Sequence, residues 1–243
     1  MMVSQRQAYG EVLAELGKEH KELVVCDADL AHATMTSIFQ SAFPDRFYDF
    51  GVAEANMVCA AAGMAHSGLV PFVSTFALFG AGRAYEQIRN SVCYANANVK
   101  FGLCHAGIST GEDGGSHQSV EDIALMRVLP NMRVFVPCDA MQLKKAVRAA
   151  VSINGPVYIR IARPPRAVIT DENTPFIPGQ ANIVRQGNDV CLMTTGLMVE
   201  ESLKAAELLA RDGVSAAVVD HICIKPFDRD ITCDFHKRMP ILT

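Results

Sequence analysis

This sequence has no concentration of positive charge. Lys and Arg together number 22 against 26 Asp and Glu, the formal net charge is −4, and no long run of like charges occurs. Proteins that bind nucleic acid usually gather Lys and Arg on one face, where these side chains neutralise phosphates. The balance of charges therefore predicts that the protein has no nucleic-acid partner.

Long apolar segments are also missing. Every apolar run stops well short of the roughly 20 residues that a membrane-spanning helix needs. The N-terminus is polar, whereas a signal peptide would have an apolar core there. We therefore expect no membrane association and a cytoplasmic location.

The eight cysteines form no Cys-x-x-Cys pair and have no spacing typical of metal ligands. We expect them to be buried, reduced thiols, and we expect no metal ligand from this chain. Tryptophan is absent as well, but this absence excludes no class of protein.

What the sequence does contain is an alternation of strand-like and helix-like apolar segments, in a chain that is 50% hydrophobic. The alternation predicts parallel βα units and a doubly wound, mostly parallel α/β sheet. We expect helices over residues 4–19, 53–66, 83–94, 141–152 and 199–212, and strands over residues 22–30, 70–76, 99–104, 133–137, 156–162, 190–194 and 216–222.

The domain boundaries are predicted from Pro- and Gly-containing stretches. We place a first domain at residues 1–166, a linker at 167–180 and a second, truncated α/β domain at 181–243. The second domain shows only one βαβ unit, and residues 228–243 lack clear periodicity. We expect this domain to be incomplete, because one such unit cannot easily cover both faces of its own sheet.

One loop concentrates polar side chains directly after a predicted buried strand. Residues 99–104 are mostly apolar, and residues 105–118 read His-Ala-Gly-Ile-Ser-Thr-Gly-Glu-Asp-Gly-Gly-Ser-His-Gln. In open α/β sheets, ligands lie beyond the carboxyl ends of the strands, where glycine lets the backbone approach them. We expect a ligand site here, although a glycine-rich turn with solvated charges would give the same pattern.

The helix predicted over residues 53–66 is apolar on nearly every face, so we expect it to be buried on both sides. Glu54 opens this helix. An ionised carboxylate that is buried is costly unless it is paired, so Glu54 would need a partner that shares its proton. The alternative is an exposed carboxylate that interacts with the helix dipole. Phe76 and Phe79 either belong to the core or form the wall of a pocket for a flat ligand.

Three further patterns give local expectations. Gly80 to Gly82 predict a break before the next helix, and Ser119 with Asp122 resembles a capping box. Arg163 follows the last strand of the first domain, where it either holds an anion or is simply solvated.

Taken together, these segments resemble the transketolase family, in particular the C-terminal subunit of split transketolases, in which two polypeptides form the enzyme. The resemblance covers residues 6–228 and depends on motifs in the order of the family. They are Arg6-Gln-Ala-Tyr-Gly10, Asp27-Ala-Asp-Leu30, Pro44-Asp-Arg-Phe47, Val52-Ala-Glu-Ala-Asn-Met-Val58, Ser74-Thr-Phe76, Gly82-Arg-Ala-Tyr-Glu-Gln-Ile-Arg89, residues 105–118, Leu129-Pro-Asn-Met132 and Ile224-Lys-Pro-Phe-Asp228.

The resemblance implies that the first domain has the pyrimidine-binding fold of thiamine diphosphate enzymes. Glu54 would be catalytic and would hydrogen-bond the aminopyrimidine ring of the cofactor. Phe79 would stack on that ring, and Phe76 would line the same pocket. Asp29 matches an aspartate that lies near the cofactor at a subunit interface.

The resemblance also implies which residues bind the phosphosugar substrates. His105, Arg6 and Arg163 match positions that hold the sugar phosphate. Asp113 and His117 match residues that hydrogen-bond the hydroxyl and carbonyl oxygens of the donor sugar, and His117 would also assist proton transfer.

One motif of the family is missing from this chain. Its Gly-Asp-Gly motif with a distant Asn, which binds the divalent metal and the diphosphate, does not occur, and residues 111–114 are Gly-Glu-Asp-Gly instead. The resemblance therefore implies a partner, the N-terminal diphosphate-binding transketolase subunit, which would hold Mg²⁺ or Ca²⁺. The assembly would be a dimer or a heterotetramer.

The resemblance predicts transfer of a two-carbon ketol unit between phosphosugars. Three alternatives remain open at this point. The chain could belong to a deoxyxylulose-phosphate synthase, to the β subunit of a 2-oxoacid dehydrogenase, or to a non-catalytic partner that retains the fold.

Overall fold

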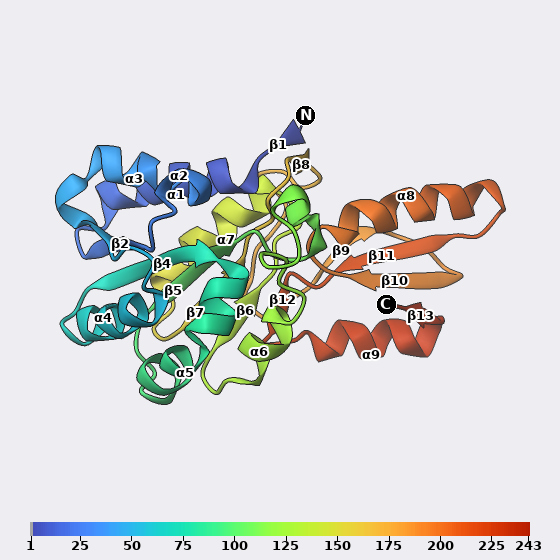
Figure 1. Cartoon of the computed structure of the whole chain (residues 1–243). Coiled ribbons are helices and arrows are strands. Elements are labelled where there is room, and N and C mark those ends of the chain that lie inside the picture. Colours follow the sequence, from blue (N-terminus) through green and yellow to red (C-terminus); the bar gives the residue numbers. More distant parts are fainter. Residues whose placement is uncertain (1) are drawn as a thin grey trace.

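Two β-sheets organise residues 2–243, which are the residues that the computed structural model describes (Figure 1). The larger sheet has seven strands in the order β12-β6-β7-β5-β4-β2-β3, and the smaller has four in the order β13-β10-β11-β9. In addition, β1 (Met2–Val3) pairs antiparallel with β8 (Arg166–Ala167). The predicted fold class, a doubly wound and mostly parallel α/β sheet followed by a second α/β unit, is confirmed.

The larger sheet is parallel throughout, except that β12 runs antiparallel to β6. Its strands are β2 (Leu23–Asp27), β3 (Phe47–Asp49), β4 (Val70–Phe76), β5 (Lys100–Cys104), β6 (Arg133–Phe135), β7 (Val157–Arg160) and β12 (Cys223–Lys225). The helical segments between them are α1 (Gln5–Glu19), α2 (Ala31–Thr34), α3 (Ser37–Ala42), η1 (Pro44–Arg46), α4 (Glu54–His66), η2 (Phe79–Arg83), α5 (Tyr85–Gln87), η3 (Ile88–Tyr94), η4 (Ile108–Asp113), α6 (Asp122–Val128) and α7 (Ala140–Ser152).

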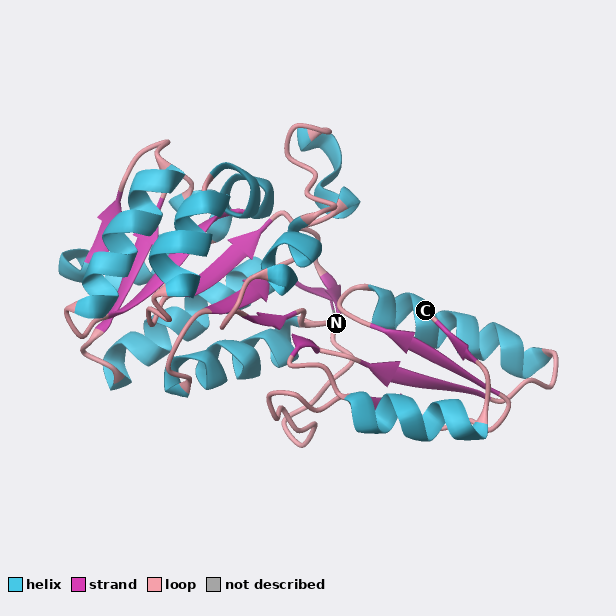
Figure 2. Cartoon of the chain, turned by 90° about the horizontal axis from the view of Figure 1, so that it is seen from below, coloured by secondary structure: helices cyan, strands magenta, loops and turns pink. Residues whose placement is uncertain are grey.

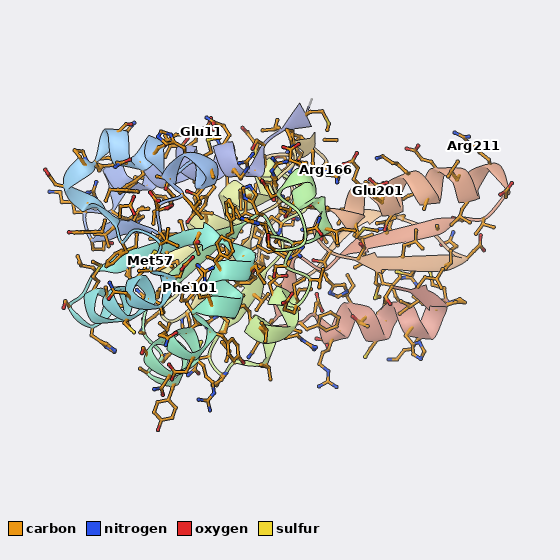
Figure 3. The ribbon with its side chains drawn as sticks, in the orientation of Figure 1. Glu11, Met57, Phe101, Arg166, Glu201 and Arg211 are labelled. Atoms are coloured by element: carbon orange, nitrogen blue, oxygen red, sulfur yellow. The ribbon has the colours of Figure 1, made fainter. Side chains whose placement is uncertain are left out.

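Helices cover both faces of this sheet (Figure 2). Side chains of α1, α3 and α7 pack with Val25 and Phe72 on one face, and side chains of α4, η2, η3 and α6 pack with Cys26 and Val73 on the other. Met57 of α4 and Phe101 of β5, both labelled in Figure 3, belong to the second of these two clusters. Successive side chains of a strand point to opposite faces. A strand buried on both faces is therefore mostly apolar, as in β2, where four apolar residues precede Asp27.

The smaller sheet consists of β9 (Asn182–Arg185), β10 (Val190–Thr194), β11 (Ala216–Asp220) and β13 (Ile241–Leu242). Only β9 runs antiparallel to its neighbour. Ala216 and Val218 pack against α8 (Met198–Arg211), and Ala217 and Val219 pack against Phe235 of α9 (Arg229–Arg238). Both faces of the smaller sheet are therefore covered.

The tail, whose sequence lacks clear periodicity, is regular in the structure, while the expectation that the second domain is truncated stays a prediction. Residues 228–243 form α9 and β13, and α9 covers the face that α8 leaves open. The Asp228 carboxylate caps α9 by accepting a hydrogen bond of 3.1 Å from the Ile231 amide. The apolar stripe of α9 is narrow, with Ile231, Phe235 and Met239 among charged residues, and so its periodicity is hard to recognise.

The late strand β12 joins the first part of the chain. It lies within residues 181–243, yet it pairs with β6 of the larger sheet. Lys225 in β12 also donates hydrogen bonds to the carbonyl oxygens of Arg127, at 3.0 Å, and of Leu129, where α6 ends. A cation at the C-terminus of a helix is favourable because the last carbonyl groups have no partner within the helix.

Helix α4 departs from the prediction of burial on both sides. Its Met57, Val58, Ala61 and Ala62 are buried, whereas the opposite side, with Asn56, Cys59 and Gly63, is exposed in this chain. The residues on that side are small or polar, so the helix does not require that the side be covered. Cys59 and Cys233 are accordingly exposed free thiols, while the other six cysteines are buried, as expected.

The predicted break at Gly80 to Gly82 does not occur. Phe79–Arg83 and Ile88–Tyr94 instead form π-helical turns on either side of α5. A π turn accommodates an additional residue without ending a helix, and such turns are frequent at functional sites. Gly80 permits this path because it lies against Leu103, where a larger side chain would collide.

None of the helices in residues 2–243 combines the length and the apolar character that crossing a membrane requires. Among the same residues, no group of three or more His, Cys, Asp and Glu side chains is arranged to hold a metal ion.

Candidate functional site

The carboxyl ends of the parallel strands meet at one edge of the larger sheet. Phe76 is the last residue of β4, His105 follows β5, and Arg163 comes shortly after β7. Glu54 begins α4, which precedes β4. The topology therefore brings residues from distant parts of the sequence to the edge where ligands of such sheets usually bind.

Aromatic rings form the centre of this edge. The ring of Phe76 stacks on the ring of His105 at 3.8 Å between centroids and lies 5.6 Å from the ring of Phe79. His117 approaches Phe76 and Phe79 edge-on, at 5.8 and 5.1 Å. Phe79 and His117 are only partly buried. The rings thus present a partly open aromatic surface, which suits a flat ligand.

His105 is held rigidly beside that surface. Its backbone is left-handed, with φ of 58°, and its carbonyl oxygen accepts a 2.8 Å hydrogen bond from the Thr110 hydroxyl. Its Nδ1 lies 3.0 Å from the Cys104 sulfur. Burial and the nearby positive charge of Arg6 lower the pKa of His105 to about 4. His105 is therefore a neutral hydrogen-bonding group near pH 7.

Charged groups surround His105. Asp113 Oδ2 lies 3.8 Å from its Nε2 and 3.2 Å from Nε of Arg163, and Arg163 Nη2 donates to the exposed Glu112 at 2.6 Å. Arg6 donates to the carbonyl oxygen of Ala33 at 2.8 Å, while its Nε is buried without a hydrogen-bond partner. Arginine forks of this kind suit phosphate and related anions, and the unused Nε of Arg6 is available to one.

Glu54 is buried and paired, which agrees with the need for a partner and excludes the exposed alternative. Its side chain is only 1% exposed, and Arg83 Nη1 donates to both carboxylate oxygens at 2.8 and 2.9 Å. The guanidinium Cζ of Arg83 also lies 4.7 Å from the centroid of the Phe79 ring. Arg83 was not among the site residues predicted from the sequence. The sequence feature that could have identified Arg83 is its position four residues after Phe79 in one helical segment.

A buried ion pair between Asp122 and Arg160 lies beside loop 105–118 and holds it in place. Asp122 accepts hydrogen bonds from the Tyr158 hydroxyl at 2.5 Å and from Nε of Arg160 at 2.7 Å, and its side chain has no exposed surface. A bridge between Ala106 and Ser119 closes the loop. The predicted capping box is therefore wrong, because Asp122 points into the core rather than to the start of α6.

Gly107 shows how closely the loop and its anchor approach one another. Its φ is 79°, and an added Cβ would lie 3.1 Å from Nη2 of Arg160. A residue other than glycine would be strained there and would press on the guanidinium group. The loop is therefore fitted to the edge of the sheet rather than being a free glycine-rich turn.

Asp29 alone among the predicted site residues is separate from this cluster. It is exposed in a left-handed turn after β2, with φ of 62°, and its amide donates to Asp49 at 3.0 Å. The turn is held by Asp27, whose carboxylate accepts from the hydroxyls of Thr34 and Thr36 at 2.8 Å each. Burial raises the pKa of Asp27 to about 6. The predicted role of Asp29 at a subunit interface stays a prediction.

A large cavity lies elsewhere, in the second unit. It has a volume of about 740 Å³, and it is lined mostly by apolar residues of β10, α8 and β13, together with His221 and Phe227. None of the predicted site residues lines it. The cluster of rings and charges, rather than this cavity, carries the groups that chemistry requires.

The residues at the sheet edge fit the ring half of thiamine diphosphate. The Glu54 carboxylate and the Phe79 ring already hold one flat group with several N–H donors, which is the guanidinium of Arg83. An aminopyrimidine is also flat and also bonds through nitrogen. The chain's residues thus match the ring in shape and in hydrogen bonding.

Two protein families together match most of this chain. Residues 1–165 match the family described as transketolase, pyrimidine binding domain, and residues 179–241 match transketolase, C-terminal domain. The first match includes the whole cluster of rings and charges.

Individual relatives agree with these family matches. The putative transketolase C-terminal section of Methanocaldococcus jannaschii is 46% identical over 93% of this chain and 72% of its own length. The 6-deoxy-6-sulfo-D-fructose transketolase subunit of a Clostridium species is 41% identical over 93% of this chain and 70% of its own length. Human transketolase is 39% identical over 96% of this chain, which spans only 37% of the human protein.

Solved structures show the same relationship. A protein described as a split gene transketolase, inactive beta4 tetramer, superposes with a TM-score of 0.90 at 46% identity, over 98% of this chain and 77% of that one. Transketolase from Campylobacter jejuni superposes with a TM-score of 0.87 at 23% identity, over 98% of this chain and 38% of that one, and so shares the fold.

Proposed function

The chain belongs to the transketolase family, and from that premise we propose that it is one subunit of a thiamine-diphosphate-dependent transketolase. In this proposal the enzyme transfers a two-carbon ketol unit between phosphosugars in the cytoplasm. The observation that supports it best is the joint position of a buried carboxylate, two phenylalanine rings and a set of anion-binding side chains at one sheet edge.

Glu54, Phe79 and Phe76 would hold the cofactor's ring. When bound, thiamine diphosphate supplies the carbon nucleophile that ketol transfer requires. Glu54 shares a proton with a ring nitrogen, and its burial makes that hydrogen bond strong because water does not compete. Phe79 and Phe76 hold the face of the ring and exclude water from it.

His117, Asp113 and His105 would handle the sugar. His117 lies over the phenylalanine rings, where it can exchange a proton with a sugar oxygen, and such assistance contributes about 10²–10⁴ in rate. Asp113 accepts hydrogen bonds from sugar hydroxyls. Neutral His105 together with Arg6 and Arg163 holds the phosphate by hydrogen bonds and charge.

A partner would complete the site. We propose that an N-terminal diphosphate-binding transketolase subunit holds the diphosphate and Mg²⁺ or Ca²⁺, and that the two chains form a dimer or heterotetramer in which Asp29 lies near the shared interface. This part of the proposal follows from the missing Gly-Asp-Gly motif and from the relative described as a C-terminal section.

The test is ketol transfer from xylulose 5-phosphate to ribose 5-phosphate, with thiamine diphosphate and Mg²⁺. We expect activity when the chain is mixed with a diphosphate-binding subunit from the same source and none from the chain alone. Glu54→Gln in the mixture should lower the rate by roughly 10²–10⁴-fold. Glu86→Gln, which changes an exposed carboxylate of α5, is the matched control and should leave the rate unchanged.

Other outcomes would favour the alternatives. Consumption of pyruvate by the mixture would indicate a synthase-like or dehydrogenase-like subunit. The absence of any thiamine-dependent reaction, or full activity in Glu54→Gln, would indicate a non-catalytic partner. A sulfonated donor, 6-deoxy-6-sulfo-D-fructose, should be tested beside the phosphosugar, because a relative 41% identical to this chain is named for it.

A further inference from the structure

Arg83 lies where two groups of the candidate ring site meet. Its Nη1 donates to both carboxylate oxygens of Glu54, and its guanidinium lies over the ring of Phe79. The Arg83 side chain is 52% exposed, whereas that of Glu54 is 1% exposed. One side chain that reaches in from solvent therefore engages the hydrogen-bonding group and the stacking group of the site at the same time.

The guanidinium group resembles the ring that the site is proposed to bind. It is planar, it carries N–H donors in a fixed fork, and it stacks on aromatic faces. An aminopyrimidine has a stacking face of similar width and a nitrogen-bearing edge that bonds a carboxylate. Because Glu54 and Phe79 cannot hold both groups in the same place, the two must compete.

We infer that Arg83 occupies the place of the aminopyrimidine ring in the ligand-free chain, and that the ring displaces it from Glu54 and Phe79 on binding. Arg83 is thus a positioning residue that sets the affinity of the site for the ring. The inference rests on the proposed function, since it presupposes that Glu54 and Phe79 bind that ring.

The local geometry makes such an exchange inexpensive in free energy for Arg83. An ion pair with a solvent-exposed partner contributes little to stability, because water solvates the released charge. A buried carboxylate without any hydrogen-bond donor is costly, so Glu54 keeps a donor throughout the exchange: Arg83 in the ligand-free chain, and water or the ring when Arg83 withdraws. Phe79 and Arg83 both belong to the π-helical segment η2, so a small change of that segment moves the arginine relative to the ring.

The competition has a measurable consequence for affinity. If the state with Arg83 withdrawn is a minor fraction of the free chain, the apparent association constant for the ring equals the intrinsic one multiplied by that fraction. Removing the arginine removes this reduction. With a withdrawn fraction of about one tenth, Arg83→Met would bind the ring roughly tenfold more tightly.

The experiment uses the full chain and the bare ring, 4-amino-2-methylpyrimidine, as the probe, so that no diphosphate site is needed. Dissociation constants are measured by NMR titration for the wild type, Arg83→Met, Arg83→Lys, Glu54→Gln and the control Arg89→Met, an exposed arginine of η3. The guanidinium N–H signals of Arg83 are followed in ¹⁵N-labelled wild-type chain during the same titration.

We expect Arg83→Met to bind roughly tenfold more tightly than the wild type, Arg83→Lys to lie between them, and Arg89→Met to match the wild type. The Arg83 signals should shift to the values of solvent-exposed arginines as the ring saturates the site. Because the signals are recorded on the wild type, they test the inference even where a variant fails to fold.

Two results would overturn the inference, and they differ in what they leave standing. If the ring binds the wild type but binds Arg83→Met no more tightly, or leaves the Arg83 signals unchanged at saturation, Arg83 lies beside the ring and the proposed function survives. If the ring binds neither chain, or binds Glu54→Gln as well as the wild type, the ring site itself is wrong and both proposals fall.

Discussion

Two carboxylates of this protein are buried and paired with arginine, but their surroundings differ. Asp122 is fully buried, its partner Arg160 is 19% exposed, and the Tyr158 hydroxyl donates a second hydrogen bond. Glu54 is equally buried, but Arg83 is 52% exposed, and its guanidinium lies over a ring rather than in the core. One pair belongs to the interior, and the other belongs to the surface of a site.

This difference distinguishes an ion pair that the fold requires from an ion pair whose cation can be replaced. Removing one member of an ion pair that protein encloses strongly destabilises the folded protein, because no water can solvate the remaining charge. A pair whose cation is half exposed can exchange partners with water or with a ligand. The anchor under loop 105–118 is of the first kind, and the candidate ring site is of the second.

Arg160→Met should have the largest effect on stability. It leaves the Asp122 carboxylate buried with only Tyr158 as a partner, and we expect the free energy of unfolding to fall by about 3–5 kcal/mol. Urea unfolding followed by circular dichroism measures this loss. Arg148→Met is the control, because Arg148 pairs only with exposed carboxylates, and it should cost at most about 1 kcal/mol. Equal losses for the two variants would mean that enclosure is not the deciding factor.

Tyr158→Phe tests the second hydrogen bond of the enclosed pair. The Tyr158 hydroxyl donates to a charged oxygen at 2.5 Å in the core, and burial with that negative charge raises the pKa of Tyr158 well above its usual value. Its loss should cost about 1.5–3 kcal/mol, the usual range for a hydrogen bond to a charged group. The same urea series measures it, with Tyr94→Phe, an exposed tyrosine, as the control. No change in Tyr158→Phe would mean that Arg160 alone satisfies Asp122.

His105 is a third buried titratable group, and it lies near the positive charges of Arg6 and Arg163. Its pKa is lowered to about 4, against about 6.5 in an unfolded chain. Between those values the unfolded chain binds a proton that the folded chain does not, so folded stability is lost as the pH falls from about 6.5 to 4. His105→Gln should flatten the pH dependence of the unfolding free energy in this window. An unchanged slope in His105→Gln would contradict the neutral His105.

Arg83→Met should have the smallest effect on stability, less than about 1 kcal/mol, because water can take the place of an exposed guanidinium. The measurement is the same urea series as for Arg160→Met, which makes the two arginines directly comparable. A loss as large as that of Arg160→Met would show that Arg83 is a structural partner of Glu54, and the contrast between the two pairs would disappear.

Much of the fold follows from local patterns in the sequence. The apolar runs of β2, β4 and β5 lie within the predicted ranges, because burial on both faces of a parallel sheet requires continuous apolar segments. Helix α1 also lies within its predicted range, and α7 begins one residue before its own. Loop 105–118 was also recognised as a candidate site, since glycines and polar residues followed a strand end.

What the sequence could not show depends on partners distant in the chain. The burial of Glu54 predicted that it needs a partner, but Arg83 is 29 residues away and reaches it only through the π-helical path of η2. Asp122 matched a local capping rule, whereas its partner Arg160 lies 38 residues later. Local rules fail where tertiary contacts determine the direction of a side chain.

The return of β12 to the larger sheet has a consequence for how the protein can be divided. During synthesis, strand β6 remains an open edge until residues 223–225 emerge, so the first sheet cannot be completed before nearly the whole chain exists. A fragment that ended in the 167–180 stretch would keep the rings and charges of the candidate site, yet it would expose a row of unpaired backbone groups to neighbouring molecules. Such a fragment should self-associate, and expression of the isolated first domain would need a substitute for that strand.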